Sequence, residues 1–174
     1  RKYFMKVKIS ILYAWFVRTL TYFLPNFPFI MRFRGFLYSL MMDKCGINFQ
    51  VTSTTYFNTL SGIKIGDNIY IGHNNVIIGL DITINDEVII GPNCVISGGN
   101  HVFKNGSFRF STSIVSKILI EKGSWIAANC TITGGTTLPE RSILAAGSVL
   151  TKKFENKESV YGGVPACFIK KIDL

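Results

Sequence analysis

The sequence predicts an all-β fold in which short parallel strands stack into a β-helix, and three observations support this. Aliphatic residues recur at every sixth position late in the chain: Ile120, Ile126, Ile132, Leu138, Leu144 and Leu150. A small side chain follows four positions after each of the first five: Ser124, Cys130, Thr136, Ser142 and Ser148. The same period occurs upstream at Ile65, Ile71 and Ile77 and, after a slip of one residue, at Ile84, Ile90 and Ile96.

A period of six residues fits neither an α-helix nor a simple alternating strand. It is typical of a hexapeptide solenoid, in which each hexad makes one short strand and one turn and three hexads close a triangular coil. The aliphatic residue then points into the narrow interior, the small residue fits near the corner, and Asn or Gly in the turn tolerates a positive φ. Because such a solenoid also serves as a plain scaffold, the period alone does not imply an enzyme.

The repeat is interrupted between Ile96 and Ile120. The length of this segment fits one further coil, and the phase of the repeat is kept at Val102, Phe108 and Ile114. The segment equally fits a loop that leaves the solenoid and returns to the same face. Because the stretch K-N-G-S-F-R-F-S-T-S (104–113) is poor in coil features and carries Arg109 and phenylalanines of exposed type, we favour an excursion loop over residues 101–118.

The length of 174 residues is typical of one domain with appendages. We expect a basic, apolar helical cap over residues 1–44, the β-helix over residues 45–155, and a tail over residues 156–174 that packs back on the coil. The net charge of +9 is uneven, since residues 1–42 hold seven basic side chains and no acidic one.

This basic segment is also strongly apolar, which is typical of a membrane surface contact as well as of a cap packed on its own domain. It is too interrupted to span a bilayer, because only nine uncharged residues separate Lys8 from Arg18 and thirteen separate Arg18 from Arg32. No nucleic-acid-binding motif accompanies the charge, so a nucleic-acid partner is not expected. The location we expect is cytoplasmic, with possible peripheral contact at the inner face of the membrane.

The four cysteines, Cys45, Cys94, Cys130 and Cys167, are widely spaced and form no C-x-x-C pair. A zinc site is therefore not expected, and free cytosolic thiols are the simplest interpretation. With an excursion loop, Cys94 and Cys130 fall at the same position of adjacent coils and stack as interior residues.

Three motifs carry chemistry: G-G-N-H (98–101), G-S-W-I-A-A-N-C-T-I (123–132), and A-A-G-S-V-L-T-K (145–152) followed by G-G-V-P-A-C-F-I-K (162–170). They resemble motifs of the hexapeptide-repeat acyltransferases, particularly the O-acetyltransferases of galactoside, maltose, xenobiotic and polysaccharide type. The resemblance covers about residues 45–173. It implies a left-handed parallel β-helix, a homotrimer with active sites between neighbouring subunits, and acetyl-CoA as the donor without any metal.

By this resemblance His101 is the general base and Asn100 holds the turn or orients the loop. An imidazole can take the proton of a sugar hydroxyl as that oxygen attacks the acetyl thioester, and then return it to the departing thiolate. His73 has no such match, and we expect it to face solvent. Two histidines also argue against the zinc carbonic anhydrases of similar fold, which need three histidine ligands.

The resemblance also implies a set of coenzyme A contacts: Trp125, Ala128, Ala146, Thr151, Lys152 and Lys170. The tryptophan would pack on the pantetheine arm or on a neighbouring subunit, and the two alanines would leave backbone groups accessible. The threonine and the two lysines would meet the phosphates. The chain departs from the family pattern at Ala127, usually glycine, and at Cys167, usually lysine.

The sequence therefore predicts an acetyl-CoA-dependent O-acetyltransferase acting on a saccharide hydroxyl in cell-envelope or capsular polysaccharide biosynthesis. An N-acyltransferase for an amino sugar or small molecule, and a non-catalytic scaffold, remain alternatives.

Overall fold

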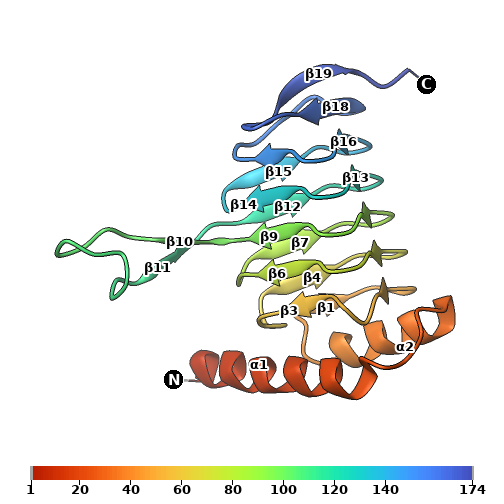
Figure 1. The fold of residues 1–174 in the computed structure, drawn as a ribbon, viewed down its shortest axis with the longest axis vertical. Helices are drawn as coiled ribbons and strands as arrows, with labels where there is room; N and C mark the ends of the chain where they lie inside the picture. The colour runs from red at the N-terminus through yellow and green to blue at the C-terminus, as the bar shows by residue number, and fades with distance from the viewer. Residues whose placement is uncertain (1, 174) are drawn as a thin grey trace.

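The computed structural model describes residues 2–173 and shows two helices followed by a tapering stack of coils (Figure 1). Helix α1 (Lys2–Thr21) and helix α2 (Pro28–Ser39) lie at one end, and three ladders of short strands form the faces of the stack. Face A contains β1 (Lys44–Cys45), β4 (Ile63–Ile65), β7 (Ile82–Ile84), β12 (Ile118–Ile120) and β15 (Thr136–Leu138). Face B contains β2 (Gln50–Val51), β5 (Tyr70–Ile71), β8 (Ile89–Ile90), β13 (Trp125–Ile126) and β16 (Ile143–Leu144). Face C contains β3 (Tyr56–Phe57), β6 (Val76–Ile78), β9 (Val95–Ser97), β14 (Thr131–Thr133) and β17 (Val149–Leu150).

Within each face, a strand pairs in parallel with the strand one coil away. Ile65 of β4 lies beside Ile84 of β7, and Ile84 lies beside Ile120 of β12. This register confirms the predicted parallel β-helix, and it confirms that residues between β9 and β12 leave the stack instead of forming a further coil. The first coil runs through β1 to β3, upstream of the point where the aliphatic period becomes visible in the sequence.

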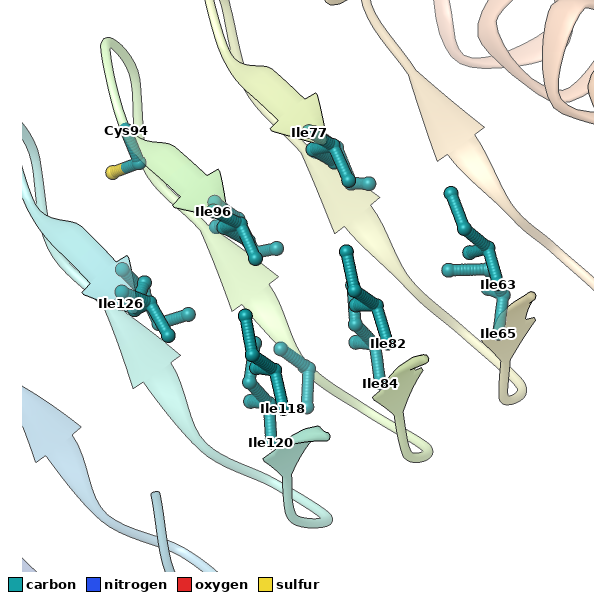
Figure 2. Close-up of a cluster of buried hydrophobic side chains, with 14 of the residues drawn as sticks. Ile63, Ile65, Ile77, Ile82, Ile84, Cys94, Ile96, Ile118, Ile120 and Ile126 are labelled. Carbon is teal, nitrogen blue, oxygen red and sulfur yellow. The ribbon is translucent and has the colours of Figure 1, made fainter. Parts of the chain in front are cut away.

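The interior is a column of aliphatic side chains contributed by all three faces (Figure 2). Every residue of the six-residue period from Ile120 to Leu150 is fully buried. Burial of one such side chain stabilises the fold by roughly 1.5–3 kcal/mol. The strands of each coil are too short to be stable on their own. The column of buried aliphatic side chains is therefore the main source of stability.

Truncation of one rung of this column should be costly. Ile96→Ala is expected to lower the free energy of unfolding by about 2–5 kcal/mol, because Ile96 is fully buried and the narrow interior cannot collapse onto the cavity. Urea denaturation measures the loss. Ile89→Ala is the matched control, since Ile89 is 50% exposed, and a loss there as large as at Ile96 would contradict the column as the stabilising element.

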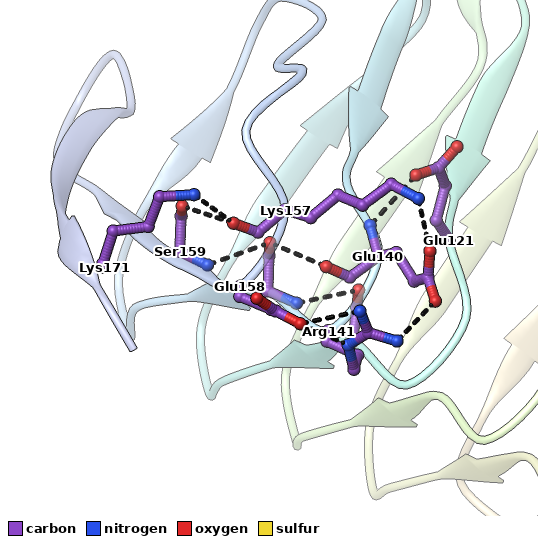
Figure 3. Close-up of polar contacts among 9 residues, drawn as sticks. Glu121, Glu140, Arg141, Lys157, Glu158, Ser159 and Lys171 are labelled. Carbon is purple, nitrogen blue, oxygen red and sulfur yellow. Dashed lines mark hydrogen bonds and ion pairs between the residues drawn. The ribbon is translucent and has the colours of Figure 1, made fainter. Parts of the chain in front are cut away.

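Asparagine residues with positive φ occupy many of the corners: Asn48, Asn68, Asn74, Asn93 and Asn129. Asparagine tolerates this left-handed conformation better than other residues that carry a Cβ. At the corner between faces A and B near the C-terminal end, charged side chains replace this pattern (Figure 3). There Arg141 bridges Glu140 and Glu158, and Lys157 reaches Glu140 from the next coil. These contacts tie successive coils together at the surface.

The chain ends by extending face B. Strand β18 (Ser159–Gly162) pairs in parallel with β16, and β19 (Cys167–Lys171) pairs antiparallel with β18 at the edge of the stack. The side chain of Tyr161 is fully buried and stacks on Phe154, with the ring centroids 4.0 Å apart. This aromatic pair closes the C-terminal end of the interior.

The helices close the opposite end. Helix α1 turns one narrow face toward the first coil, where Ser10 Oγ and Thr59 Oγ1 lie 2.6 Å apart and Ala14 and Val17 are buried. Tyr13 donates a hydrogen bond to the carbonyl of Leu37 in α2. Between residues 2 and 173, neither helix is long and apolar enough to cross a membrane.

Candidate active site

Insertions into the six-residue repeat lie mainly at one corner, where the chain passes from face C to face A. The slip of one residue lies there at Gly79, and the excursion of residues 98–117 leaves and returns there. Gly98 fixes its base, because its N–H bonds the carbonyl of Ile78 and its carbonyl accepts the N–H of Ser116, both at 2.8 Å. A Cβ on Gly134, in the next coil, would lie 2.9 Å from the Gly98 oxygen, so this corner requires glycine there.

The excursion is an ordered hairpin. Strand β10 (Gly99–His101) pairs antiparallel with β11 (Ser113–Val115), and His101 lies opposite Ser113. At the far end, Lys104 and Ser107 exchange two backbone hydrogen bonds across Asn105 and Gly106, both at positive φ. This Asn-Gly turn matches the twist of a hairpin, and it is the sequence signal that could have predicted one.

His101 faces an open hollow of about 530 Å³ that is lined by His101, Phe108 and Arg109. Phe108 packs on Phe103 with the ring centroids 5.0 Å apart, and the Arg109 guanidinium lies 5.4 Å from the centre of the Phe110 ring. The hollow thus combines an imidazole, a cation and apolar rings, a set that can hold a hydroxyl-bearing or anionic molecule. The proximity of Phe108 and Arg109 to His101 could not be predicted from the sequence, since it depends on the hairpin register.

Asn100 does not share this hollow. Consecutive residues of a strand point to opposite sides, so the side chains of Asn100 and His101 lie on opposite faces of the hairpin. Asn100 pairs with Ile114 across the hairpin. A role for Asn100 in holding the loop is compatible with this geometry, whereas direct contact with a molecule at His101 is not.

Two of the predicted donor contacts, Ala128 and Ala146, stack at the corner between faces B and C. The carbonyl of Ala128 accepts the N–H of Gly147, so the two turns lie on successive coils. The turn over 163–166 covers the next position, where Val149 donates its N–H to the carbonyl of Gly163 and accepts the N–H of Ala166. Small side chains leave the peptide groups of this corner accessible along the edge of the stack.

Thr151 and Lys152 lie at the other end of face C, at the same corner as the hairpin but beyond β14 and β17. The Lys152 ammonium lies 5.3 Å from the centre of the Phe154 ring. Next to them, Lys117 and Lys153 line a hollow of about 130 Å³ on face A. No sequence motif marks these two lysines, because they become neighbours only when the excursion returns to the stack.

Trp125 and Lys170 lie elsewhere. Trp125 is on face B and 47% exposed, and Lys170 is on the edge strand β19, 3.8 Å from the Asp173 carboxylate. None of the predicted donor contacts lines the hollow at His101. A single chain therefore brings together His101 with Phe108 and Arg109, and Ala128 with Ala146, but it leaves these groups on separate parts of its surface.

The remaining histidine and the cysteines take the predicted places. His73 is exposed, and its Nδ1 lies 3.4 Å from Thr54 Oγ1. Cys94 and Cys130 are buried one coil apart. Their mutual hydrogen bond together with burial raises the pKa of Cys94. Residues 2–173 contain no cluster of three or more His, Cys, Asp or Glu side chains arranged to hold a metal ion.

Comparison with known proteins supplies the family. No protein-family model matches the chain. The chain is 31% identical over 158 residues to a galactoside O-acetyltransferase of Escherichia coli strain K12, covering 90% of this chain and 77% of that protein.

Two solved structures share the fold over 95% of this chain. One is a hexapeptide-repeat-containing acetyltransferase of Vibrio cholerae O1 biovar eltor complexed with acetyl coenzyme A, with a TM-score of 0.80, 25% identity and 88% of that chain covered. The other is a galactoside acetyltransferase in complex with coenzyme A, with a TM-score of 0.81, 28% identity and 82% of that chain covered. The chain therefore belongs to the hexapeptide-repeat acetyltransferases.

Proposed function

We propose that this protein transfers the acetyl group of acetyl-CoA to a saccharide hydroxyl, with His101 as the general base. The observation that carries the proposal is the position of His101, held by a hairpin beside an open hollow with Phe108 and Arg109. The similar Escherichia coli protein is named a galactoside O-acetyltransferase, and both structural neighbours hold coenzyme A or its acetyl ester.

The chemistry needs one proton acceptor and no covalent enzyme intermediate. His101 takes the hydroxyl proton while the sugar oxygen attacks the thioester carbonyl, and the resulting imidazolium gives the proton to the departing thiolate sulfur. Charge on the tetrahedral oxygen requires hydrogen-bond donors, for which backbone N–H groups near the hairpin or near Trp125 are the candidates. Cys94 and Cys130 are fully buried, so neither is placed to act as a nucleophile.

The donor has two kinds of partner in this chain. The corner that carries Ala128 and Ala146 offers peptide groups to the amides of a pantetheine arm. The corner that carries Lys152 offers cations to the phosphates, together with Lys117 and Lys153 on the adjoining face. We also assign Trp125, Thr151 and Lys170 to donor contact, on the motif resemblance alone.

We further propose that the enzyme is a homotrimer. Figure 1 shows β10 and β11 projecting away from their own coils, so the end of the hairpin is free to reach a neighbouring copy. The hairpin also exposes large apolar side chains, among which Phe110 is 89% exposed. A second copy would bury these rings and bring His101 toward a donor corner that its own chain does not place beside it.

For the acceptor we propose a cell-envelope or capsular saccharide, acetylated on the cytoplasmic side. The support is the surface of helices α1 and α2, which is apolar and cationic and so is suited to contact with a membrane. The N-acyltransferase alternative uses the same donor corner, and the identity of the acceptor decides between the two.

Calorimetric titration with acetyl-CoA and with CoA tests the donor without an acceptor. We expect saturable binding with one site per chain, weakened about tenfold by Lys152→Ala, because an exposed cation loses its phosphate partner. Lys64→Ala is the matched control, since Lys64 is an exposed lysine on face A far from the donor corners. Absence of binding to folded protein at millimolar ligand would refute the donor, and an equal loss for Lys64→Ala would refute the assigned phosphate site.

A further inference from the structure

Helix α1 exposes an apolar ridge. The face of α1 opposite the coils carries Met5, Ile9, Leu12, Trp15 and Phe16, and Phe23 follows just beyond the end of the helix; all six are more than half exposed. We call these six residues the α1 ridge. Exposed apolar residues are normal when scattered, but a continuous ridge of this kind marks a contact surface. Helix α1 lies across the base of the stack, not along its axis (Figure 1). Its buried residues Ser10, Ala14 and Val17 lie on the opposite side of the helix from the ridge.

Helix α2 extends the apolar surface at the same end of the molecule. It buries Met31, Gly35 and Tyr38 and exposes Phe29, Phe33, Phe36 and Leu40, each at least half exposed. Aromatic side chains are among the exposed apolar residues of both helices. Phe, Tyr and Trp are the residues that gather where a helix lies in the boundary between lipid headgroups and acyl chains.

The charge of this surface has one sign. Lys8 lies on α1 between the ridge residues and Arg32 lies on the outer face of α2, and both are exposed. Residues 1–42 contain no carboxylate, and the nearest acid, Asp43, is engaged by Lys6 at 2.7 Å. An apolar face with only cations around it is complementary to an apolar layer under anionic headgroups.

Arg18 adds a polar anchor at the edge of the ridge. It lines a hollow of about 270 Å³ with Trp15, Thr19, Tyr22 and Phe23. Its guanidinium lies between two rings, 5.6 Å from the centre of the Tyr56 ring of the first coil and 6.0 Å from the centre of the Tyr22 ring. Its Nε is buried and has no hydrogen-bond partner among the described residues. The buried Nε is not accessible to a headgroup, so the terminal N–H groups of the guanidinium, which lines the hollow, are the donors that can reach a phosphate oxygen.

We propose that the α1 ridge docks this protein onto an anionic phospholipid bilayer, with α1 lying in the plane of the interface and Arg18 directed to a headgroup phosphate. Helix α1 is too short in uninterrupted apolar length to span, so the contact is peripheral. The coils then extend away from the membrane surface. Because strands repeat at about 4.8 Å and the hairpin leaves two strands beyond β3, it projects roughly 10 Å above the first coil, clear of the lipid.

Flotation of the full chain with vesicles tests this proposal without any assumption about catalysis. We expect the wild-type protein to float with vesicles of equal parts phosphatidylcholine and phosphatidylglycerol, and more weakly with phosphatidylcholine alone. The double variant Trp15→Ser/Phe16→Ser should lower the partition coefficient about 100-fold on both, because it removes two large apolar side chains. Lys8→Gln and Arg18→Gln should each lower it about fivefold on the anionic vesicles only.

Two substitutions at the opposite end of the stack are matched controls. Ile169→Ser removes an apolar side chain that is 56% exposed, and Lys171→Gln removes an exposed cation, so both should leave flotation unchanged. Sedimentation of all variants reports the oligomeric state. Failure of the wild type to float, or equal loss in the controls, overturns the proposal. Dissociation of an oligomer by the Trp15→Ser/Phe16→Ser variant, without any loss of flotation, would instead show that a second copy covers the ridge.

Discussion

His101→Ala is expected to lower kcat about 1000-fold, the loss that follows removal of a general base from an acyl transfer. The KM for acetyl-CoA should change little, because none of the predicted donor contacts lines the hollow at His101. Release of the CoA thiol measures the rate, with galactosides as the first acceptors because the Escherichia coli relative is named for them.

His73→Ala is the matched control for this experiment. It removes the only other histidine of the chain, and His73 is exposed at a corner of face B on the second coil. We expect its kcat to stay within twofold of the wild type. Asn100→Ala should cost less than His101→Ala, because the Asn100 side chain points away from the hollow and acts only through the hairpin. Retention of more than a tenth of the wild-type kcat by His101→Ala would exclude the general-base role.

The period of six residues predicted the coils because it reports one physical requirement, an inward side chain in every strand. At a corner, the sequence is less informative. The hairpin could be read as another coil, since Val102, Phe108 and Ile114 keep the phase of the repeat by coincidence. In the structure Phe108 and Ile114 are exposed, and the Asn-Gly turn at the far end decides the local fold.

Their roles stay predictions, but His101 and Ala128 were identified as candidate site residues from short motifs. Their neighbours were not, because Phe108 reaches His101 through antiparallel pairing, and Lys117 reaches Lys153 through the return of the chain to face A. Such contacts depend on the length of the excursion and on the register of the coils. A count of charges along the sequence was also misleading at one position, Arg34, which belongs to the basic segment by sequence but is fully buried.

Arg34 is a buried cation with no carboxylate partner within residues 2–173, and its five N–H donors are used on neutral oxygens. Its Nε bonds Thr21 Oγ1 at 3.1 Å, and its Nη2 reaches the carbonyls of Thr21 and Leu24 at the end of α1. Its Nη1 bonds Asn26 Oδ1 at 3.1 Å and the Val51 carbonyl of the first coil at 2.7 Å. One side chain therefore joins α1, the linker, α2 and face B, with the positive charge at the negative end of the α1 dipole.

Arg34→Met is expected to lower the free energy of unfolding of the helical end by about 3–5 kcal/mol, because it leaves buried oxygens without donors. Arg34→Lys should recover only part of this loss, since an ammonium has three donors and no planar fork. Arg32→Met, on the exposed face of the same helix, is the matched control and should stay within about 0.5 kcal/mol of the wild type.

Hydrogen exchange gives the decisive measurement, because a solenoid unfolds by neighbouring units and not always as a whole. In Arg34→Met, amide protection should fall in α1, α2 and the first coil, while β14 to β17 stay protected. The hairpin is anchored at Gly98 by Ile78 and Ser116, two coils away from Val51, so turnover at His101 should survive in the same variant. Unchanged protection in α1 would mean that apolar packing alone holds the helices, and that the five hydrogen bonds of Arg34 do not.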